Sequence, residues 1–311
     1  MIDVSDVRSA DERIDGRIRR TPVLAAGPGL WFKLEHLQHA GSFKTRGMLN
    51  RIVDPPAAGI VAASGGNAGL AAAYAARELG AAAEVFLPVT APAVKVAKLG
   101  ELGARVVLEG GEYAEAYAAA TVRAAQTGAL FCHAYDDSAM VAGNGTIGLE
   151  LLSQVPGGFD TVLVAVGGGG LLGGMVASLR GDARIVAVEP VTSSAFHAAQ
   201  RAGHPVDVPV SGVAADALGA RRIGDIAFEL ARDVPSVLVE DDAIVDARRR
   251  LWDDYRIVVE HGTAAAYAAL LSKTYQPEPG ERVVVLLCGA NTDPADLTTA
   301  RAHRPDSLQP S

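Results

Sequence analysis

Short apolar segments alternate with alanine-rich segments along most of this chain, and this alternation constrains the fold more than any other feature. The apolar segments, rich in β-branched residues, cover 59–64, 83–88, 104–108, 129–134, 160–166, 184–190 and 281–290. The alanine-rich or helix-like segments cover 67–80, 91–103, 112–128, 171–181 and 193–203. This order predicts an α/β fold with open, mainly parallel, twisted sheets and helices on both faces. Ligands of such sheets bind beyond the carboxyl ends of the strands.

The composition indicates a globular protein and argues against several classes of function. The 311 residues, 49% hydrophobic and 21% charged, suffice for a large core. A net charge of −8 argues against nucleic-acid binding. The charged N-terminus and the lack of a long apolar run argue against a signal peptide or a membrane span. Two distant cysteines, Cys132 and Cys288, argue against a disulfide framework. We therefore expect a cytoplasmic protein that acts on a small molecule.

A glycine run is the strongest local motif. Four consecutive glycines lie between a predicted strand and a predicted helix: Gly167, Gly168, Gly169 and Gly170. The backbone N–H groups of such a loop, together with the helix dipole, suit a phosphate group. Gly168, Gly170 and Gly173 also satisfy the pattern G-x-G-x-x-G, and Glu189 ends the next strand, where a ribose-binding acid would lie. An NAD(P)-dependent oxidoreductase is therefore an open alternative.

Lys44 lies in the stretch AGSFKTRG, between an aromatic residue and a short polar run. Two interpretations are open. In the plain one, a turn leads into a helix with Ser42 as its N-cap. In the other, the lysine is held away from other charges as an amine nucleophile that can form a Schiff base. Burial would favour such a role because it disfavours the ammonium form.

Two further strand ends carry candidate ligand-binding groups. The sequence SGGN, with Ser64, Gly65 and Asn67, joins a predicted strand to a predicted helix. Its backbone donors and the Asn67 amide suit a carboxylate or another oxyanion, and a simple helix cap is the plain alternative. Cys288 ends a buried strand. It is either a small apolar core residue or a neutral thiol facing a heterocycle nitrogen.

In chain order, these stretches resemble the pyridoxal-phosphate enzymes of fold type II, in particular the serine/threonine dehydratase branch. The match runs from KLEHLQHAGSFKTRG to LLCGAN and so covers nearly the whole chain. The resemblance implies two open, mainly parallel sheets flanked by helices, with a smaller domain inserted in the larger. It implies a small domain at residues 40–140 and a large cofactor-binding domain at residues 1–39 and 141–311. It also implies a homodimer.

The resemblance implies a role for each candidate residue. Lys44 would be the catalytic residue and form the Schiff base with pyridoxal 5'-phosphate, and Phe43 would pack against this cofactor. Asn67 would bond the phenolic oxygen, and Cys288 would face the pyridine nitrogen. The cofactor phosphate would be bound by the backbone N–H groups of Gly167, Gly168, Gly169, Gly170 and Leu171. The substrate carboxylate would be bound by Ser64, Gly65 and Asn67.

The reaction implied by the resemblance is β-elimination from L-threonine, L-serine or a related β-hydroxy amino acid, which gives a 2-oxo acid and ammonia. Serine racemase-like activity is an alternative, but racemising relatives carry a serine where this chain has Gly65. Some relatives also bind a divalent cation through an aspartate, and Ala195 stands in its place, so no metal site is predicted. Ala217 and Ala290 replace glycines, which leaves the shape of the pocket beside the β-carbon open.

Two other regions are similar to family motifs. Glu260 begins a stretch similar to a family motif, which implies that Glu260 approaches the cofactor. In the plain alternative it is an acidic residue that stabilises the start of a helix. Tyr135, Asp136 and Asp137 lie in a region that we interpret as structural.

Overall fold

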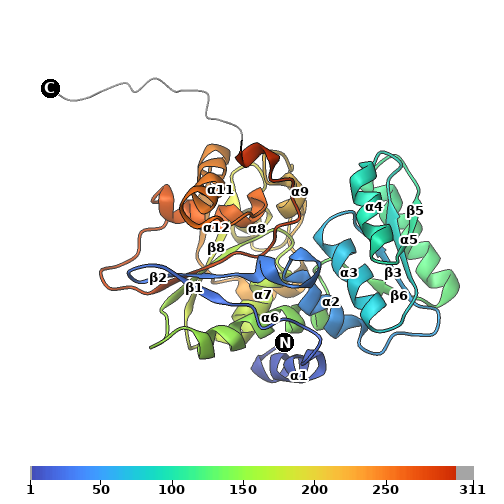
Figure 1. The fold of residues 1–311 in the computed structure, drawn as a ribbon, viewed down its shortest axis with the longest axis horizontal. Helices are drawn as coiled ribbons and strands as arrows, with labels where there is room; N and C mark the ends of the chain where they lie inside the picture. Colours follow the sequence, from blue (N-terminus) through green and yellow to red (C-terminus); the bar gives the residue numbers. More distant parts are fainter. Residues whose placement is uncertain (1, 299–311) are drawn as a thin grey trace.

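The structure, a computed structural model, describes residues 2–298 and contains two separate β-sheets flanked by helices (Figure 1). The strands of the larger sheet are β1 (Val23–Gly27), β2 (Leu30–Lys33), β7 (Thr161–Ala165), β8 (Arg184–Pro190), β9 (Ser236–Val239) and β10 (Val283–Leu286). The strands of the smaller sheet are β3 (Ile60–Ala63), β4 (Ala83–Leu87), β5 (Arg105–Leu108) and β6 (Leu130–Cys132). Their orders are β1-β2-β10-β7-β8-β9 and β5-β4-β3-β6. β1 pairs antiparallel with β2, and the other neighbours pair parallel.

The helices divide between the two sheets and the junction between them (Figure 1). Those around the smaller sheet are α3 (Asn67–Glu78), α4 (Ala93–Glu101) and α5 (Tyr113–Thr127). At the junction, α2 (Lys44–Ile52) packs against α6 (Ser138–Gln154). The remaining α-helices are α1 (Val4–Ile14), α7 (Gly170–Leu179), α8 (Ala195–Ala202), α9 (Ala215–Leu218), α10 (Asp225–Ala231), α11 (Asp241–Tyr255) and α12 (His261–Leu271). Three short 3₁₀ turns are η1 (Glu35–Leu37), η2 (His39–Gly41) and η3 (Ala295–Leu297).

The predicted fold class is confirmed. The strands of the smaller sheet all lie between residues 60 and 132, and the strands of the larger sheet lie on both sides of them in sequence. The smaller sheet is therefore inserted in the larger one, as the resemblance implies. The boundaries at residues 40 and 140 stay a prediction. Within the described residues, no helix is both long and apolar enough to cross a bilayer.

The central strands explain the apolar runs of the sequence. Every residue of β3, β7 and β10 is buried, because helices cover both faces of these strands. The strands β1, β2 and β9 were not predicted, and their residues are mostly only partly buried.

A buried ionic network ties the junction helices to the larger sheet. The guanidinium of Arg46, in α2, bonds both carboxylate oxygens of Glu35 at 2.7 and 2.9 Å. It also contacts Glu150 of α6 at 2.8 Å. Lys33, at the end of β2, bonds the same Glu150. Lys33, Glu35 and Arg46 are fully shielded from solvent. Each charge therefore relies on its partners, and loss of one partner would leave a buried charge unpaired.

We expect Arg46→Met to lower the free energy of unfolding by about 3–5 kcal/mol, because Glu35 and Glu150 would lose their shared cation. Urea unfolding followed by circular dichroism would measure the change. Arg232→Met is the matched control, since Arg232 forms an exposed pair with Glu229 and its loss should change stability little. A loss in Arg46→Met no greater than that of the control would contradict this view of the network.

Candidate active site

One pocket brings together most of the residues predicted for the site. It lies beyond the carboxyl ends of β7 and β10, and α2 and α3 complete its wall. The predicted residues that line it are Phe43, Lys44, Asn67, Gly167, Gly168, Gly169, Gly170, Leu171 and Cys288. In sequence, Lys44 precedes the strands of the smaller sheet, Asn67 lies among them, and the glycine loop and Cys288 follow them. The pocket therefore forms only when the two sheets are assembled as observed.

Lys44 is the first residue of α2 and reaches into this pocket. Its Nζ donates a hydrogen bond of 2.8 Å to the backbone oxygen of Ala134 and lies 5.1 Å from the centre of the Phe43 ring. Burial lowers the pKa of Lys44 to about 8, against the smaller opposing effects of Cys288 and Glu260. A substantial fraction of this amine is therefore neutral near pH 8, as a nucleophile or base requires.

The expected N-cap at Ser42 is not formed. The residue before α2 is Phe43, which makes no side-chain cap bond. The Ser42 hydroxyl is buried and has no hydrogen-bond partner among residues 2–298. The backbone of Ser42 instead pairs with Gly289, and Phe43 N–H donates to the oxygen of Cys288 at 3.0 Å. These bonds, rather than a cap, hold the start of α2 against the end of β10.

The glycine loop follows β7 and opens α7, so its backbone N–H groups lie at the positive end of a helix dipole. Side chains are excluded from it by close packing. A Cβ atom on Gly168 would lie 2.3 Å from the Tyr135 ring, and one on Gly170 would lie 2.7 Å from the Tyr135 backbone oxygen. Gly169 has φ 89°, a conformation that favours glycine. The loop therefore has the backbone donors and the shape of an anion cradle.

Cys288 is a neutral thiol in this pocket. Burial raises its pKa to about 12, and its Sγ lies 3.3 Å from the Thr263 hydroxyl. Thr263 also donates to the backbone oxygen of Gly289 at 2.9 Å. The hydroxyl is thus held beside the sulfur, and the sulfur carries no formal charge at neutral pH.

Glu260 and Asn67 line the pocket next to Gly289, the residue after Cys288. The Asn67 Nδ2 donates to Glu260 Oε1 at 2.6 Å. Burial raises the pKa of Glu260 to about 7, and the bond from Asn67 and the charge of Lys44 partly offset this effect. Glu260 is therefore a contact residue of the pocket rather than a helix-start acid alone. These two residues also line a second, outer groove, together with Gly65, Lys95, Asp216 and Asn291.

The outer groove lies between the inserted segment and the rest of the chain. Gly65 faces it, whereas the Ser64 Oγ accepts the N–H of Gly66 within the turn at 3.2 Å. Lys95 of α4 and Asp216 of α9 contact each other across the groove at 3.2 Å. Ala217 lines the inner pocket. The groove shares Asn67 and Glu260 with the inner pocket and so adjoins the pocket that Lys44 lines.

Glu189 does not point toward the glycine loop's ligand side. It is fully buried, and its two oxygens accept the N–H groups of Phe196 and His197, each at 2.8 Å. The carboxyl group therefore caps α8 and is not free to bond a ribose. Burial raises its pKa to about 7. Within residues 2–298, no group of three His, Cys, Asp or Glu side chains is arranged to hold a metal ion.

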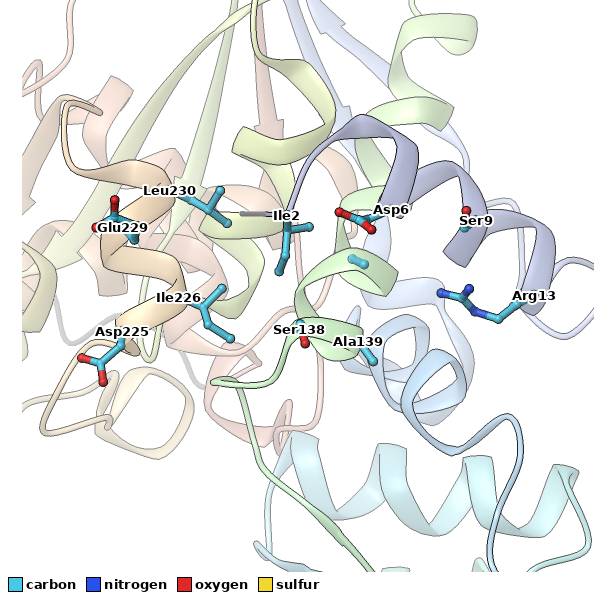
Figure 2. A pocket seen from close by; sticks show the side chains of 11 residues that line it. Ile2, Asp6, Ser9, Arg13, Ser138, Ala139, Asp225, Ile226, Glu229 and Leu230 are labelled. Atoms are coloured by element: carbon cyan, nitrogen blue, oxygen red, sulfur yellow. The ribbon is translucent and has the colours of Figure 1, made fainter.

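A wide groove of about 1000 Å³ lies elsewhere, between α1, the start of α6 and α10 (Figure 2). Ile226 and Leu230 contribute apolar side chains to it, and Asp6, Arg13 and Glu229 contribute charged ones. None of the predicted site residues lines it. Most of the predicted site residues line the inner pocket instead.

Sequence reasoning missed several residues of the inner pocket. Tyr135 was interpreted as structural, but its ring lies against the glycine loop and lines the pocket. Leu218 and Gly262 line the same pocket and were not predicted. Tyr135 follows β6, so the rule that ligands bind at strand ends would have identified it. Leu218 and Gly262 lie in helices and carry no comparable signal.

Comparison with known proteins gives consistent matches. The family model described as "Pyridoxal-phosphate dependent enzyme" matches residues 14–289. The chain is 37% identical to L-threonine ammonia-lyase of Geobacter sulfurreducens, over 94% of this chain and 76% of that protein. It is 35% identical to phenylserine dehydratase of Ralstonia pickettii, over 94% of each chain. The structure of maize serine racemase superposes with a TM-score of 0.88 at 30% identity, covering 95% of each chain.

The residues of the pocket fit this cofactor. Pyridoxal phosphate carries an aldehyde, a phosphate and a ring nitrogen. Lys44 offers a partly neutral amine for the aldehyde, and the glycine loop offers backbone donors at a helix N-terminus for the phosphate. Asn67 and Cys288 offer neutral polar groups on the walls.

We expect Cys132 and Cys288 to resist alkylation by iodoacetamide at pH 8 in the folded protein. Burial raises the pKa of each thiol to about 12, so the thiolate fraction at pH 8 is on the order of 10⁻⁴. Mass spectrometry would count modified cysteines before and after urea unfolding, which should make both reactive. Rapid modification of Cys288 in the folded chain would contradict the neutral, shielded thiol.

Proposed function

Because the chain belongs to the family of pyridoxal-phosphate dependent enzymes, we propose that it catalyses β-elimination from L-threonine, L-serine or a related β-hydroxy amino acid. The α-proton and the β-hydroxyl are lost as water, and a water molecule then hydrolyses the resulting imine to a 2-oxo acid and ammonia. The observation that carries this proposal is the Lys44 amine, whose pKa burial lowers to about 8, in one pocket with the glycine loop. The relatives named L-threonine ammonia-lyase and phenylserine dehydratase support it.

Each step that the protein itself performs has a residue suited to it. When bound, pyridoxal phosphate serves as an electron sink that weakens the bond between the substrate α-carbon and its hydrogen. Lys44 Nζ accepts that proton, since a partly neutral amine can act as a base near neutral pH. The backbone N–H groups of residues 167–171 hold the phosphate through the positive end of α7. The turn of Ser64 and Gly65 binds the substrate carboxylate with backbone donors at the start of α3.

Cys288 contributes a neutral partner to the ring nitrogen. A carboxylate there would hold the nitrogen protonated, whereas a thiol with a pKa of about 12 imposes no charge. With Cys288 as its partner the nitrogen would not be held protonated, so loss of the β-hydroxyl would compete better with alternative fates of the substrate. This choice of partner favours elimination.

Racemisation is the second candidate, because serine racemases are among the relatives and similar structures. Racemisation needs a proton donor on the face of the α-carbon opposite Lys44. Gly65 offers no side chain there, and a Cβ at this position would already lie 3.1 Å from Leu87. The nearby Lys95 is paired with Asp216 at 3.2 Å. These observations favour elimination, and chiral chromatography of recovered substrate should detect no D-enantiomer.

We also propose that the protein is a cytoplasmic homodimer. Two free, buried cysteines suit a reducing compartment. The family resemblance supports a dimer. Light scattering should then give a mass of twice 32.0 kDa, and a mass of one chain would contradict it.

The purified protein should be yellow, and borohydride should bleach it and leave a reduced cofactor adduct on Lys44. Lys44→Ala should lower kcat for 2-oxo acid formation at least ~10³-fold, since the variant lacks both the nucleophile and the base. Absorption spectroscopy, peptide mass analysis and an assay of 2-oxo acid from L-threonine and L-serine would measure these effects.

Lys273→Ala is the matched control for this experiment. Lys273 is exposed and lines neither the inner pocket, nor the outer groove, nor the wide groove beside α1. Its colour and turnover should equal those of the unmodified protein. An adduct on another lysine would contradict the proposal. A colourless protein that binds a nicotinamide dinucleotide would favour the oxidoreductase alternative.

Cys288→Asp should shift the visible absorption band and lower the share of substrate that is eliminated, because a carboxylate would hold the ring nitrogen protonated. The product mixture and the spectrum of the bound cofactor would be compared with those of Cys288→Ser, which keeps a neutral donor. Cys132→Ser, in the smaller sheet, controls for loss of a buried thiol. An unchanged spectrum and product mixture in Cys288→Asp would remove the role given to the thiol.

A further inference from the structure

A chain of hydrogen bonds along one wall of the pocket has a fixed direction. Asn291 Nδ2 donates to the backbone oxygen of Ala40 at 2.8 Å and to Asn67 Oδ1 at 2.6 Å. Asn67 Nδ2 then donates to Glu260 Oε1 at 2.6 Å. Because a backbone carbonyl can only accept, Ala40 requires Asn291 to present its NH₂ group. Asn67 must therefore turn its oxygen toward Asn291 and its own NH₂ group toward Glu260.

The backbone around this chain is shaped to fit it. Ala40 has φ 53°, a left-handed conformation that is uncommon outside glycine. Gly41 follows with φ 72°, and a Cβ on it would lie 2.7 Å from Asn291 Oδ1. A Cβ on Gly289 would lie 2.3 Å from Glu260 Oε1. Strained backbone of this kind is concentrated at functional sites. Both ends of the hydrogen-bond chain thus depend on special backbone positions.

Glu260 is placed to respond to pH. It lines the inner pocket as well as the outer groove, so protons can reach it from solvent. Burial raises its pKa to about 7. The charged and titratable groups around it come from five elements or their ends: Lys44 of α2, Lys95 of α4, Asp216 of α9, His261 beside it in α12, and Cys288 after β10.

We propose that Asn291 and Glu260 are positioning residues that hold the Asn67 amide in one orientation, and that the charge of Glu260 sets how firmly it is held. This inference rests on the proposed function and on the role that the family resemblance implies for Asn67, a bond to the phenolic oxygen of the cofactor. Asn67 Nδ2 carries two hydrogens, so one remains for that oxygen while the other is bound by Glu260.

The sign of the pH effect follows from the acceptor. A carboxylate accepts a hydrogen bond more strongly than a carboxylic acid does. The hydrogen bond from Asn67 to Glu260 is therefore strong above pH 7. It weakens as the pH falls through about 7, where Glu260 takes up a proton. Glu260→Gln keeps an oxygen that can accept from Asn67 but no longer titrates. Asn291→Asp removes the donor that fixes Asn67 and places an acceptor against Ala40.

The test is side-chain amide NMR of the full chain, labelled with ¹⁵N-asparagine and freed of cofactor, between pH 6 and 9. We expect the Asn67 NH₂ signal, assigned through Asn67→Asp, to titrate with a midpoint near pH 7. The titration should vanish in Glu260→Gln. Asn50 is an internal control, since it bonds Arg13 and the backbone of Ala139 and its signal should not move with a midpoint near pH 7.

Cofactor binding provides the second measurement. At pH 8.5 we expect the dissociation constant for pyridoxal phosphate to rise roughly tenfold in Asn291→Asp, as loss of a positioned hydrogen bond predicts. In Glu260→Gln the dissociation constant should rise less than in Asn291→Asp, because a neutral amide oxygen still accepts from Asn67, although more weakly than a carboxylate does.

Three outcomes would overturn the inference: an Asn67 signal that does not titrate, a titration that persists in Glu260→Gln, or unchanged cofactor affinity in Asn291→Asp. The titration of the Asn67 signal is measured on the unmodified protein, and a variant is needed only to assign the signal. Misfolding of a variant therefore cannot explain an absent titration. Failure of the proposed function is separable. A protein that never binds pyridoxal phosphate refutes that function, whereas the titration of cofactor-free protein still tests the control of Asn67 by Glu260.

Discussion

Arg46 lies two residues after Lys44 in the same helix, and its guanidinium is enclosed by the carboxylates of Glu35 and Glu150. This buried contact joins α2 to η1 and α6, and Lys33 extends it to β2. The first turn of α2 is therefore held by elements of the larger sheet and its surroundings. As a consequence, the position of the Lys44 amine depends on an ionic network that never touches the pocket. The two parallel bonds from Arg46 to Glu35 constrain both the distance and the orientation between α2 and η1.

The second constraint is the meeting of two parallel sheets at their carboxyl ends. β7 and β10 supply the glycine loop and Cys288, whereas β3 and β6 supply the turn before Asn67 and the segment with Tyr135. The two halves are joined across the outer groove by the bonds of Asn67 with Glu260 and Asn291, and also by the pair of Lys95 and Asp216. Such a pair is weak in water. This pair therefore adds little to the hold that the bonds of Asn67 have on the two halves.

The sequence was sufficient for the fold class because fully buried parallel strands produce long apolar runs, as in β7 and β10. It was insufficient for β1, β2 and β9, since half-buried strands lack that pattern. Site residues at strand ends, such as Cys288, were predictable from their position. Tyr135 had the same signal and was overlooked. The contact of Asn291 with Asn67 could not be predicted from the sequence. It accompanies a left-handed backbone at Ala40, and no sequence pattern indicates that conformation for an alanine.

Burial shifts each ionisable group of the pocket in the same sense, toward its neutral form. The pKa of Lys44 falls to about 8, and those of Glu260 and Cys288 rise to about 7 and about 12. The walls consequently carry less charge near neutral pH than their residue types suggest. A bound phosphate would then be the largest local charge, and the backbone donors at the start of α7 would be its principal counterpart. Because those donors are fixed dipoles, they bind the anion without leaving a permanent cation beside Lys44, whose amine remains free to gain and lose its proton.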